Sequence, residues 1–169
     1  MTTSLLTEGF GHHVWATCTL IDVCVTLSED QLQANAPGTY GPIIDTVRHI
    51  VGADTDYLTV LSGGEVKNID EDTMDLGALR AEMVLNEGRW AEVLPRHLDP
   101  DAIVVRHRDD GSESHAPAGT RLTQALQHGT DHRSQICTAL TSLGIEPPEI
   151  DLWAYADSQG RLKVVDNPG

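Results

Sequence analysis

Apolar residues recur at helical spacing in four long segments of the chain. In the first segment they follow one another at steps of three or four residues, which places them on one face of an α-helix: Phe10, Val14, Cys18, Ile21 and Val25. The other three segments show a similar period and end at glycine or proline residues. The pattern predicts helices over about residues 5–27, 42–61, 73–94 and 118–143.

The segment between the third and fourth predicted helices has the pattern of a β-hairpin. Residues 103–105 are β-branched, and residues 112–115 follow after Asp109-Asp110-Gly111. An Asp-Gly pair favours the tight turn that joins two antiparallel strands. We therefore expect a short hairpin at this place.

These elements together predict an all-α fold, a four-helix bundle with the short β-hairpin between its third and fourth helices. At 169 residues the chain has the usual length of a single domain, and we expect one domain over residues 1–169. In the tail, Pro147 and Pro148 exclude one continuous helix. We expect the apolar residues of the tail to pack across the bundle, namely Ile150, Leu152, Trp153 and Tyr155.

Charge narrows the range of partners. The formal net charge of −15 repels phosphate backbones and anionic membrane surfaces, so we expect no binding to nucleic acid or membrane. The N-terminus lacks the pattern of a signal peptide and no long apolar run follows it, so we expect a cytoplasmic protein. Cys18, Cys24 and Cys137 form no C-x-x-C pair and fit small buried side chains better than thiolate ligands or a reactive thiol.

Two histidines in the fourth predicted helix have the spacing of metal ligands. His128 and His132 are four residues apart and therefore project from one face of a helix. Gly129 stands where a zinc protease would carry the glutamate that acts as general base, so that class is excluded. Glycine also weakens a helix by about 1 kcal/mol relative to alanine, which fits either close approach of a neighbour or ligand, or simple helix packing.

The second predicted helix offers a third imidazole. His49 lies beside the apolar stripe of its helix, as His128 and His132 lie beside theirs, so the three would converge if the two helices were neighbours. Three neutral imidazoles can hold a divalent ion and leave coordination positions open, as in catalytic sites. From residue types alone, surface histidines or hydrogen-bonded core histidines remain an equal alternative.

Polar residues near these histidines are candidates for orienting them. A ligand histidine usually donates its other N–H to a carboxylate or carbonyl, and Asp45 and Gln135 are placed to accept from His49 and His132. Asp45 fits equally well an exposed acid in the first turn of its helix. Asp54 and Arg133 fall on apolar stripes and could form a buried pair, although a snorkelling Arg133 or a shifted helix phase explains the same pattern.

The motifs together resemble the DinB-like superfamily, also called YfiT-like putative metal-dependent hydrolases. The resemblance covers nearly the whole chain and rests on three elements in order: Thr46-Val47-Arg48-His49-Ile50, His128-x3-His132-x2-Gln135 and Asp151-Leu152-Trp153-x-Tyr155. It implies a four-helix bundle, often a homodimer, with zinc, nickel or another divalent ion held by His49, His128 and His132. His12, His13, His97, His107 and His115 match no ligand position and are expected to be surface or loop residues.

The resemblance also implies a class of activity. Relatives include S-transferases that use mycothiol or bacillithiol and a mycothiol-dependent isomerase, so we expect a metal-dependent S-transferase acting on a small electrophile. A metal-dependent hydrolase of a small ester or amide is the nearest alternative. From another class, the chain could be a non-catalytic, stress-associated binding module that a metal stabilises.

Overall fold

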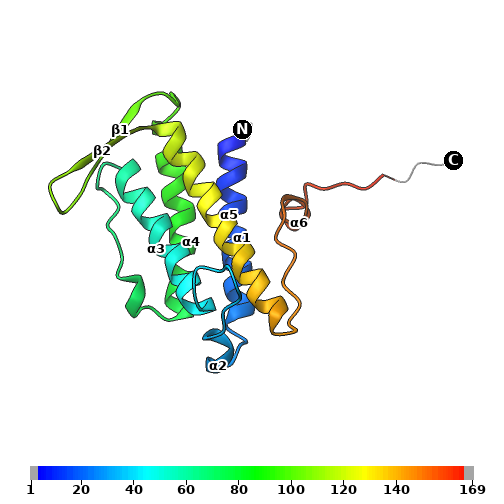
Figure 1. Ribbon diagram of the computed structural model, residues 1–169. Helices are drawn as coiled ribbons and strands as arrows, with labels where there is room; N and C mark the ends of the chain where they lie inside the picture. The colour runs from blue at the N-terminus through cyan, green and yellow to red at the C-terminus, as the bar shows by residue number, and fades with distance from the viewer. Residues whose placement is uncertain (1–3, 166–169) are drawn as a thin grey trace.

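Four long helices lie side by side in the computed structural model, which describes residues 4–165 (Figure 1). They are α1 (Leu5–Cys24), α3 (Ile43–Leu61), α4 (Leu76–Val93) and α5 (Ala118–Ser142). The remaining helical turns are short: α2 (Glu29–Leu32), η1 (Glu71–Thr73), η2 (Leu94–Arg96) and α6 (Leu152–Ser158). The predicted all-α bundle is confirmed.

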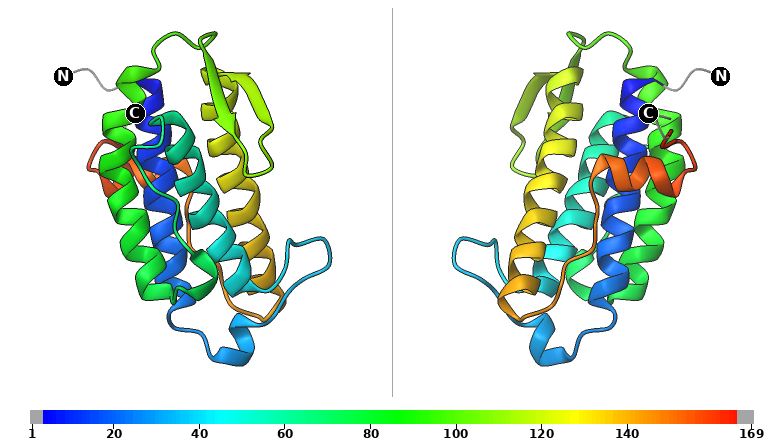
Figure 2. Two further views of the ribbon diagram at one scale, coloured as in Figure 1. Left: turned by 90° about the vertical axis from the view of Figure 1, so that its left-hand side faces the viewer. Right: turned by 90° about the vertical axis from the view of Figure 1, so that its right-hand side faces the viewer.

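The four helices form a closed ring in which α1 contacts α4, α4 contacts α3, α3 contacts α5, and α5 contacts α1. A long connection over residues 62–75 returns the chain to the end of the bundle where α3 began, so α3 and α4 run in the same direction (Figures 1 and 2). As a consequence α3 and α5 are antiparallel neighbours. The two helices that carry the predicted ligands therefore lie side by side.

Helix boundaries follow local sequence. Ser4 caps α1 by accepting the N–H of Thr7, and Asp75 caps α4 by accepting the N–H of Ala78. α1 ends at Cys24, three residues before its predicted end, and Val25 is 56% exposed. Ser28, which follows the predicted segment, caps the separate short helix α2.

The predicted hairpin is present and longer than expected. Strands β1 (Ile103–His107) and β2 (Glu113–Pro117) pair antiparallel, with Val105 opposite His115. Gly111 has φ of +81° in the turn, a conformation that glycine adopts without strain. Arg121 of α5 donates to the carbonyls of Val104 and Ser114, which fastens the hairpin to the start of α5.

The core is apolar around a polar centre. Phe10 and Trp90 pack with ring centroids 4.2 Å apart, and aliphatic side chains from all four helices surround them. The polar centre, which we call the central network, is at most 3% exposed and consists of His13, Thr17, Asp54, Asn86, Trp90 and Arg133. Its hydrogen bonds join α1, α3, α4 and α5.

Two expectations about this centre need correction. His13 was expected at the surface, yet it is 1% exposed, because its ring faces α3 and α5 and finds hydrogen-bond partners there. Asp54 and Arg133 are both buried, but the ring of His13 stands between them, so their link is through the imidazole. Burial lowers the pKa of Arg133 to about 10, and Asp54 opposes that shift, so the guanidinium remains charged at neutral pH.

The tail packs across the bundle only in part. Tyr155 of α6 lies against Trp15 of α1 with ring centroids 5.5 Å apart, and its hydroxyl occupies the space that a side chain at Gly11 would fill. Leu152 and Trp153, which were expected to be packed, are 52% and 71% exposed. Successive residues of a helix lie about 100° apart, so Leu152, Trp153 and Tyr155 cannot all face the bundle. Among the described helices, none combines the length and apolar character needed to cross a membrane.

Candidate metal centre

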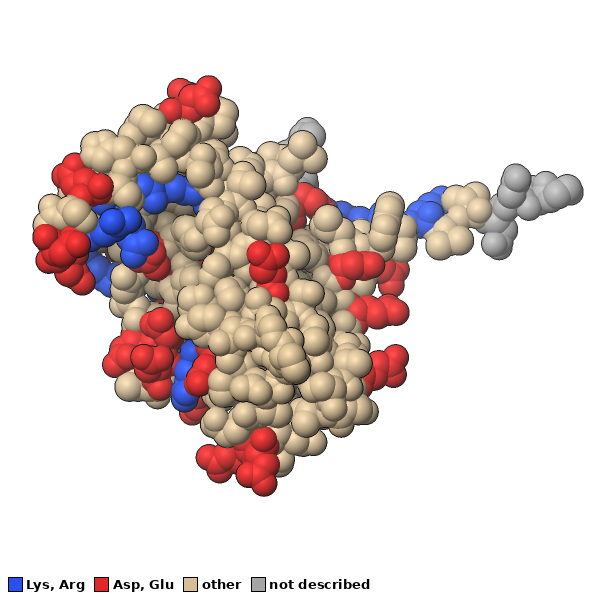
Figure 3. Space-filling view, in the orientation of Figure 1, with Lys and Arg blue, Asp and Glu red and all other residues tan. Residues whose placement is uncertain are grey.

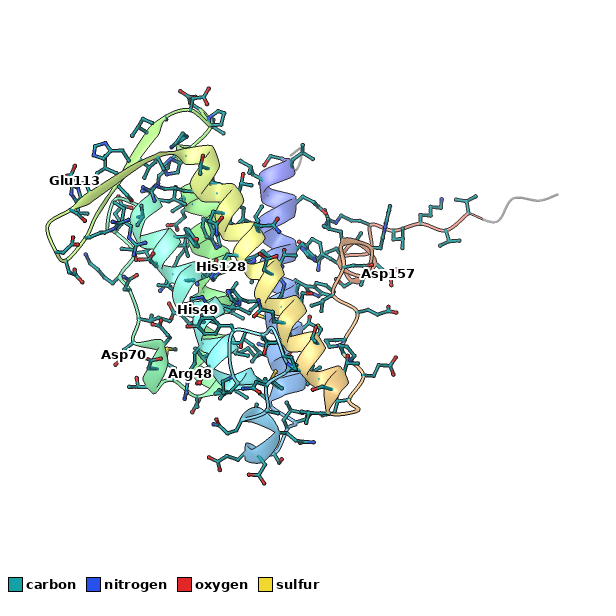
Figure 4. All side chains as sticks on the ribbon, in the orientation of Figure 1. Arg48, His49, Asp70, Glu113, His128 and Asp157 are labelled. Atoms are coloured by element: carbon teal, nitrogen blue, oxygen red, sulfur yellow. The ribbon has the colours of Figure 1, made fainter. Side chains whose placement is uncertain are left out.

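Three imidazoles meet between α3 and α5. His49 comes from α3, and His128 and His132 come from adjacent turns of α5, and we call these residues the histidine cluster. One ring nitrogen from each lies within 4.8 Å of the others, and the Nε2 atoms of His49 and His128 are 3.0 Å apart. Figure 4 labels His49 and His128 close to each other, on the neighbouring helices α3 and α5. The convergence predicted from sequence is thus present.

The cluster has the donor set of a divalent cation site. An ion that binds imidazole nitrogens at about 2.0–2.1 Å holds any two of them about 3.0–3.4 Å apart. The 3.0 Å between the Nε2 atoms of His49 and His128 matches that spacing. All three side chains are half-buried, so protein covers one side and the other is open. The residues present therefore fit a bound divalent ion.

Two rings of the histidine cluster, those of His49 and His128, resist protonation. Burial, and then the neighbouring imidazoles of His132 and His49, lower the pKa of His128 to about 4. Burial, and then His132, also lower the pKa of His49. At neutral pH these two rings are consequently neutral, and a neutral imidazole is the form that coordinates a metal.

Gln135 orients one of the three rings. Its side-chain oxygen lies 3.2 Å from Nδ1 of His132 and also accepts the backbone N–H of Tyr40 at 2.8 Å. An amide oxygen only accepts, so Nδ1 of His132 carries the hydrogen and Nε2 keeps its lone pair for the centre of the cluster. The contact expected between Gln135 and His132 is present.

Asp45 does not orient His49 but is the exposed first-turn acid that was the alternative. Its carboxylate pairs with Arg48 at 3.3 Å, one turn along α3, and is half exposed. Among the hydrogen bonds of residues 4–165, none joins Asp45 to His49. Asp45 is an acid in the first turn of α3, which the positive end of the helix dipole favours.

Tyr40 was not anticipated from the sequence, because it lies in a loop whose course depends on the folded bundle. Its ring stacks on His49 at 4.2 Å with an interplanar angle of 8°, and its edge meets His132 at 5.3 Å. The ring is 56% exposed and covers part of the open side of the cluster. The hydrogen bond from its backbone to Gln135 fastens the loop to α5.

Glu71 was also missed, because residues 65–72 had only the composition of an acidic surface loop. Its carboxyl group lies over Gly52 of α3 and occupies the space that a Cβ there would fill. Gly52 is one turn beyond His49, and the negative charge of Glu71 acts on the pKa of His49, opposing the effect of burial. Gly52, a glycine one turn from a candidate ligand, was the signal in the sequence that could have indicated a close neighbour at this place.

A cavity of about 390 Å³ opens beside His49. It is lined by Tyr40, His49 and three carboxylates, those of Asp45, Glu71 and Asp72. Figure 3 shows acidic atoms gathered in the part of the surface where Figure 4 labels Asp70, the residue next to Glu71. The cavity beside His49 is therefore acidic, and we call it the acidic entrance.

The remaining histidines lie outside the cluster. His107 and His115 are exposed and pair with Glu113 in the hairpin, as expected of surface residues. His12 and His97 are partly buried and bond the carbonyls of Ile150 and Leu61, each at 2.7 Å. These two contacts tie the tail to α1 and the turn after α4 to α3.

Comparison with known protein families matches residues 1–166 to the DinB family. The match includes both helices of the histidine cluster and the short helix α6. A search of curated proteins found no match to this chain.

Proposed function

Because the chain belongs to the DinB family, we propose that it is a metal-dependent enzyme that transfers a low-molecular-weight thiol to a small electrophile. The observation that carries the proposal is the convergence of His49, His128 and His132, of which His49 lines an open cavity. Three imidazoles complete a structural site only with a fourth protein ligand, and a catalytic site leaves that position free. Zinc and nickel both suit this donor set.

A divalent ion in the cluster would act as a Lewis acid that lowers the pKa of a thiol or water beside it. The chain supplies the other functions. Gln135 keeps His132 in one tautomer, and Tyr40 shields His49 from solvent on one side. The carboxylates of Asp45, Glu71 and Asp72 face whatever enters the cavity.

The acidic entrance narrows the choice of thiol. Two arginines close to the cluster in sequence are already engaged, since Arg48 bonds Asp45 and the carbonyl of Met74, and Arg133 belongs to the central network. A thiol that carries carboxylates, such as bacillithiol, would be repelled by the entrance. A thiol rich in uncharged sugar hydroxyls, such as mycothiol, fits the carboxylate acceptors better.

One observation favours hydrolysis of a small ester or amide as a second candidate. Within residues 4–165 the carboxylate of Glu71 accepts no hydrogen bond, and it lies close enough to His49 to influence its pKa. A free carboxylate beside a metal site is a suitable general base for water. The two reactions differ in whether the thiol is consumed.

The test is an assay of the metal-loaded protein in two arms. One arm follows loss of mycothiol or bacillithiol in the presence of small electrophiles, and the other follows ester or amide cleavage without thiol. We expect thiol loss that disappears in His49→Ala and persists in His115→Ala, since His115 is exposed and lies in the hairpin. Turnover without thiol supports hydrolysis. Absence of turnover in both arms by a protein that holds its metal supports a non-catalytic module.

A further inference from the structure

The central network and the histidine cluster use adjacent positions on α5, where Arg133 directly follows His132. The middle member of the network is His13 of α1, whose Nε2 is 3.0 Å from Oδ1 of Asp54 on α3 and whose Nδ1 is 2.9 Å from Nη1 of Arg133 on α5. α1 contributes no residue to the cluster. The ring of His13 nevertheless joins the two helices that do.

The partners of His13 allow it one tautomer. A guanidinium has only donors, so Nδ1 of His13 must accept from Arg133. A carboxylate has only acceptors, so Nε2 must carry the hydrogen and donate to Asp54. Both bonds need the ring in one orientation, which fixes the distance and direction between Asp54 and Arg133.

On α5 the network and the cluster use adjacent positions. Gly129 and Arg133 directly follow His128 and His132 and lie about 100° farther round the helix. Arg133 bonds His13, and a Cβ at Gly129 would lie 2.6 Å from Nδ1 of His13. The ring therefore lies against α5 next to both candidate ligands, and any rotation of α5 that moves the ligands also disturbs this contact.

On α3 the carboxylate of Asp54 is held from several sides. Besides His13, it accepts Nδ2 of Asn86 at 2.8 Å and Nε1 of Trp90 at 3.1 Å, both from α4. Asp54 is 3% exposed and lies five residues beyond His49 on the same helix. A fixed Asp54 consequently fixes the height and rotation of the helix that presents His49.

From these contacts we infer that His13 is a positioning residue of the metal centre, which sets α3 and α5 so that His49 meets His128 and His132. The inference rests on the proposed metal site and adds a residue of a third helix to it. It also explains the glycine at position 129, for which the sequence left two explanations, a close neighbour or simple helix packing. The imidazole of His13 is the close neighbour.

Two variants disturb this arrangement in different ways. His13→Asn keeps an acceptor near the place of Nδ1 and loses the donor to Asp54. Gly129→Ala keeps every hydrogen-bonding side chain and displaces the ring by steric overlap. The matched control is Leu79→Ala, a fully buried residue of α4 outside the central network, which destabilises the core by leaving a cavity.

The measurement is the affinity for Zn²⁺, by competition with a chromophoric chelator at a temperature where circular dichroism shows each protein folded, together with the visible spectrum of the Co²⁺ form. We expect both variants to bind Zn²⁺ about tenfold or more weakly and to change the Co²⁺ spectrum, as loss of orienting partners does at other metal sites. Leu79→Ala should match the wild type in affinity and spectrum.

Wild-type affinity and spectrum in a folded His13→Asn protein would overturn the inference, and if that variant does not fold, the same result in Gly129→Ala would do so. Equal weakening in Leu79→Ala would also overturn it, since the effect would then be general loss of stability. If the wild type itself binds no Zn²⁺ or Co²⁺, the proposed metal site fails first and the inference with it. The wild-type control thus separates the two failures.

Discussion

The three imidazoles of the histidine cluster are held by different neighbours. His132 is oriented by the amide of Gln135, His49 by stacking against Tyr40, and His128 by the other two rings and the edge of Tyr57 at 6.2 Å. At the scale of single residues, the orientation of each ring therefore depends on a particular partner. Replacing one partner should affect one ligand without unfolding the bundle.

Gln135→Leu should weaken metal binding by about tenfold, because His132 loses the acceptor that fixes its tautomer. The same change removes the acceptor for the backbone of Tyr40, which frees the loop over the cluster. Competition titration with Zn²⁺ measures the effect. Gln127→Leu, an exposed change on the same helix, is the control and should bind as the wild type does; equal affinity of the two variants would contradict the role given to Gln135.

The cysteines should be poor nucleophiles in the folded protein. Burial raises the pKa of Cys18 to about 11 and that of Cys24 to about 12, and it raises the pKa of Cys137 as well. Since the thiolate is the reactive form, labelling with a thiol reagent at pH 8 should be slow when native and complete in denaturant. Fast labelling of one thiol in the native protein would instead indicate a reactive cysteine.

At the scale of elements, helical periodicity carried most of what the sequence could predict. The four helices, the hairpin and the facing of His49, His128 and His132 follow from which positions are apolar, because residues four apart share a face. His13, Tyr40 and Glu71 could not be found in this way. Their contacts depend on how α1 packs against α3 and α5 and on the course of two loops, and neither is encoded in a local pattern.

Acid should destabilise the metal-free protein through the histidines that lie between α3 and α5. The pKa of His128 is lowered to about 4 and that of His49 falls in the same direction, while an unfolded chain binds these protons near pH 6.5. The unfolded state therefore binds more protons across this window, so stability is lost as the pH falls from about 6.5 towards 4. Denaturant unfolding at pH 7, 6 and 5 should show that decline, and His128→Gln should show a shallower one. An equally steep decline of stability with pH in the wild type and in His128→Gln would contradict the lowered pKa of His128.

At the scale of the whole molecule, metal binding should be coupled to the stability of the helix bundle. The histidine cluster joins α3 to α5, and the central network joins those helices to α1 and α4, so an ion that binds the folded state stabilises the entire ring of helices. A homodimer, suggested by the family resemblance, remains a prediction that analytical ultracentrifugation can check. The exposed Leu152 and Trp153 are the places to look for protection in such a dimer.

Chelation should lower the melting temperature of the whole protein. An ion present at about a hundred times its dissociation constant contributes about 2.7 kcal/mol, and a chain of this size shifts by roughly 2–4 °C per kcal/mol, so removal should cost about 5–10 °C. Differential scanning calorimetry with and without a chelator measures the shift. His49→Ala should melt at one temperature in both conditions, and a chelator effect of equal size in that variant would show that the ion is held elsewhere.

The most direct test of the metal centre is elemental analysis of the purified protein and its histidine variants. We predict about one zinc or nickel ion per chain in the wild type and in His115→Ala, and a small fraction of that in folded His49→Ala, His128→Ala and His132→Ala. Full metal content in all three of the folded cluster variants would contradict it.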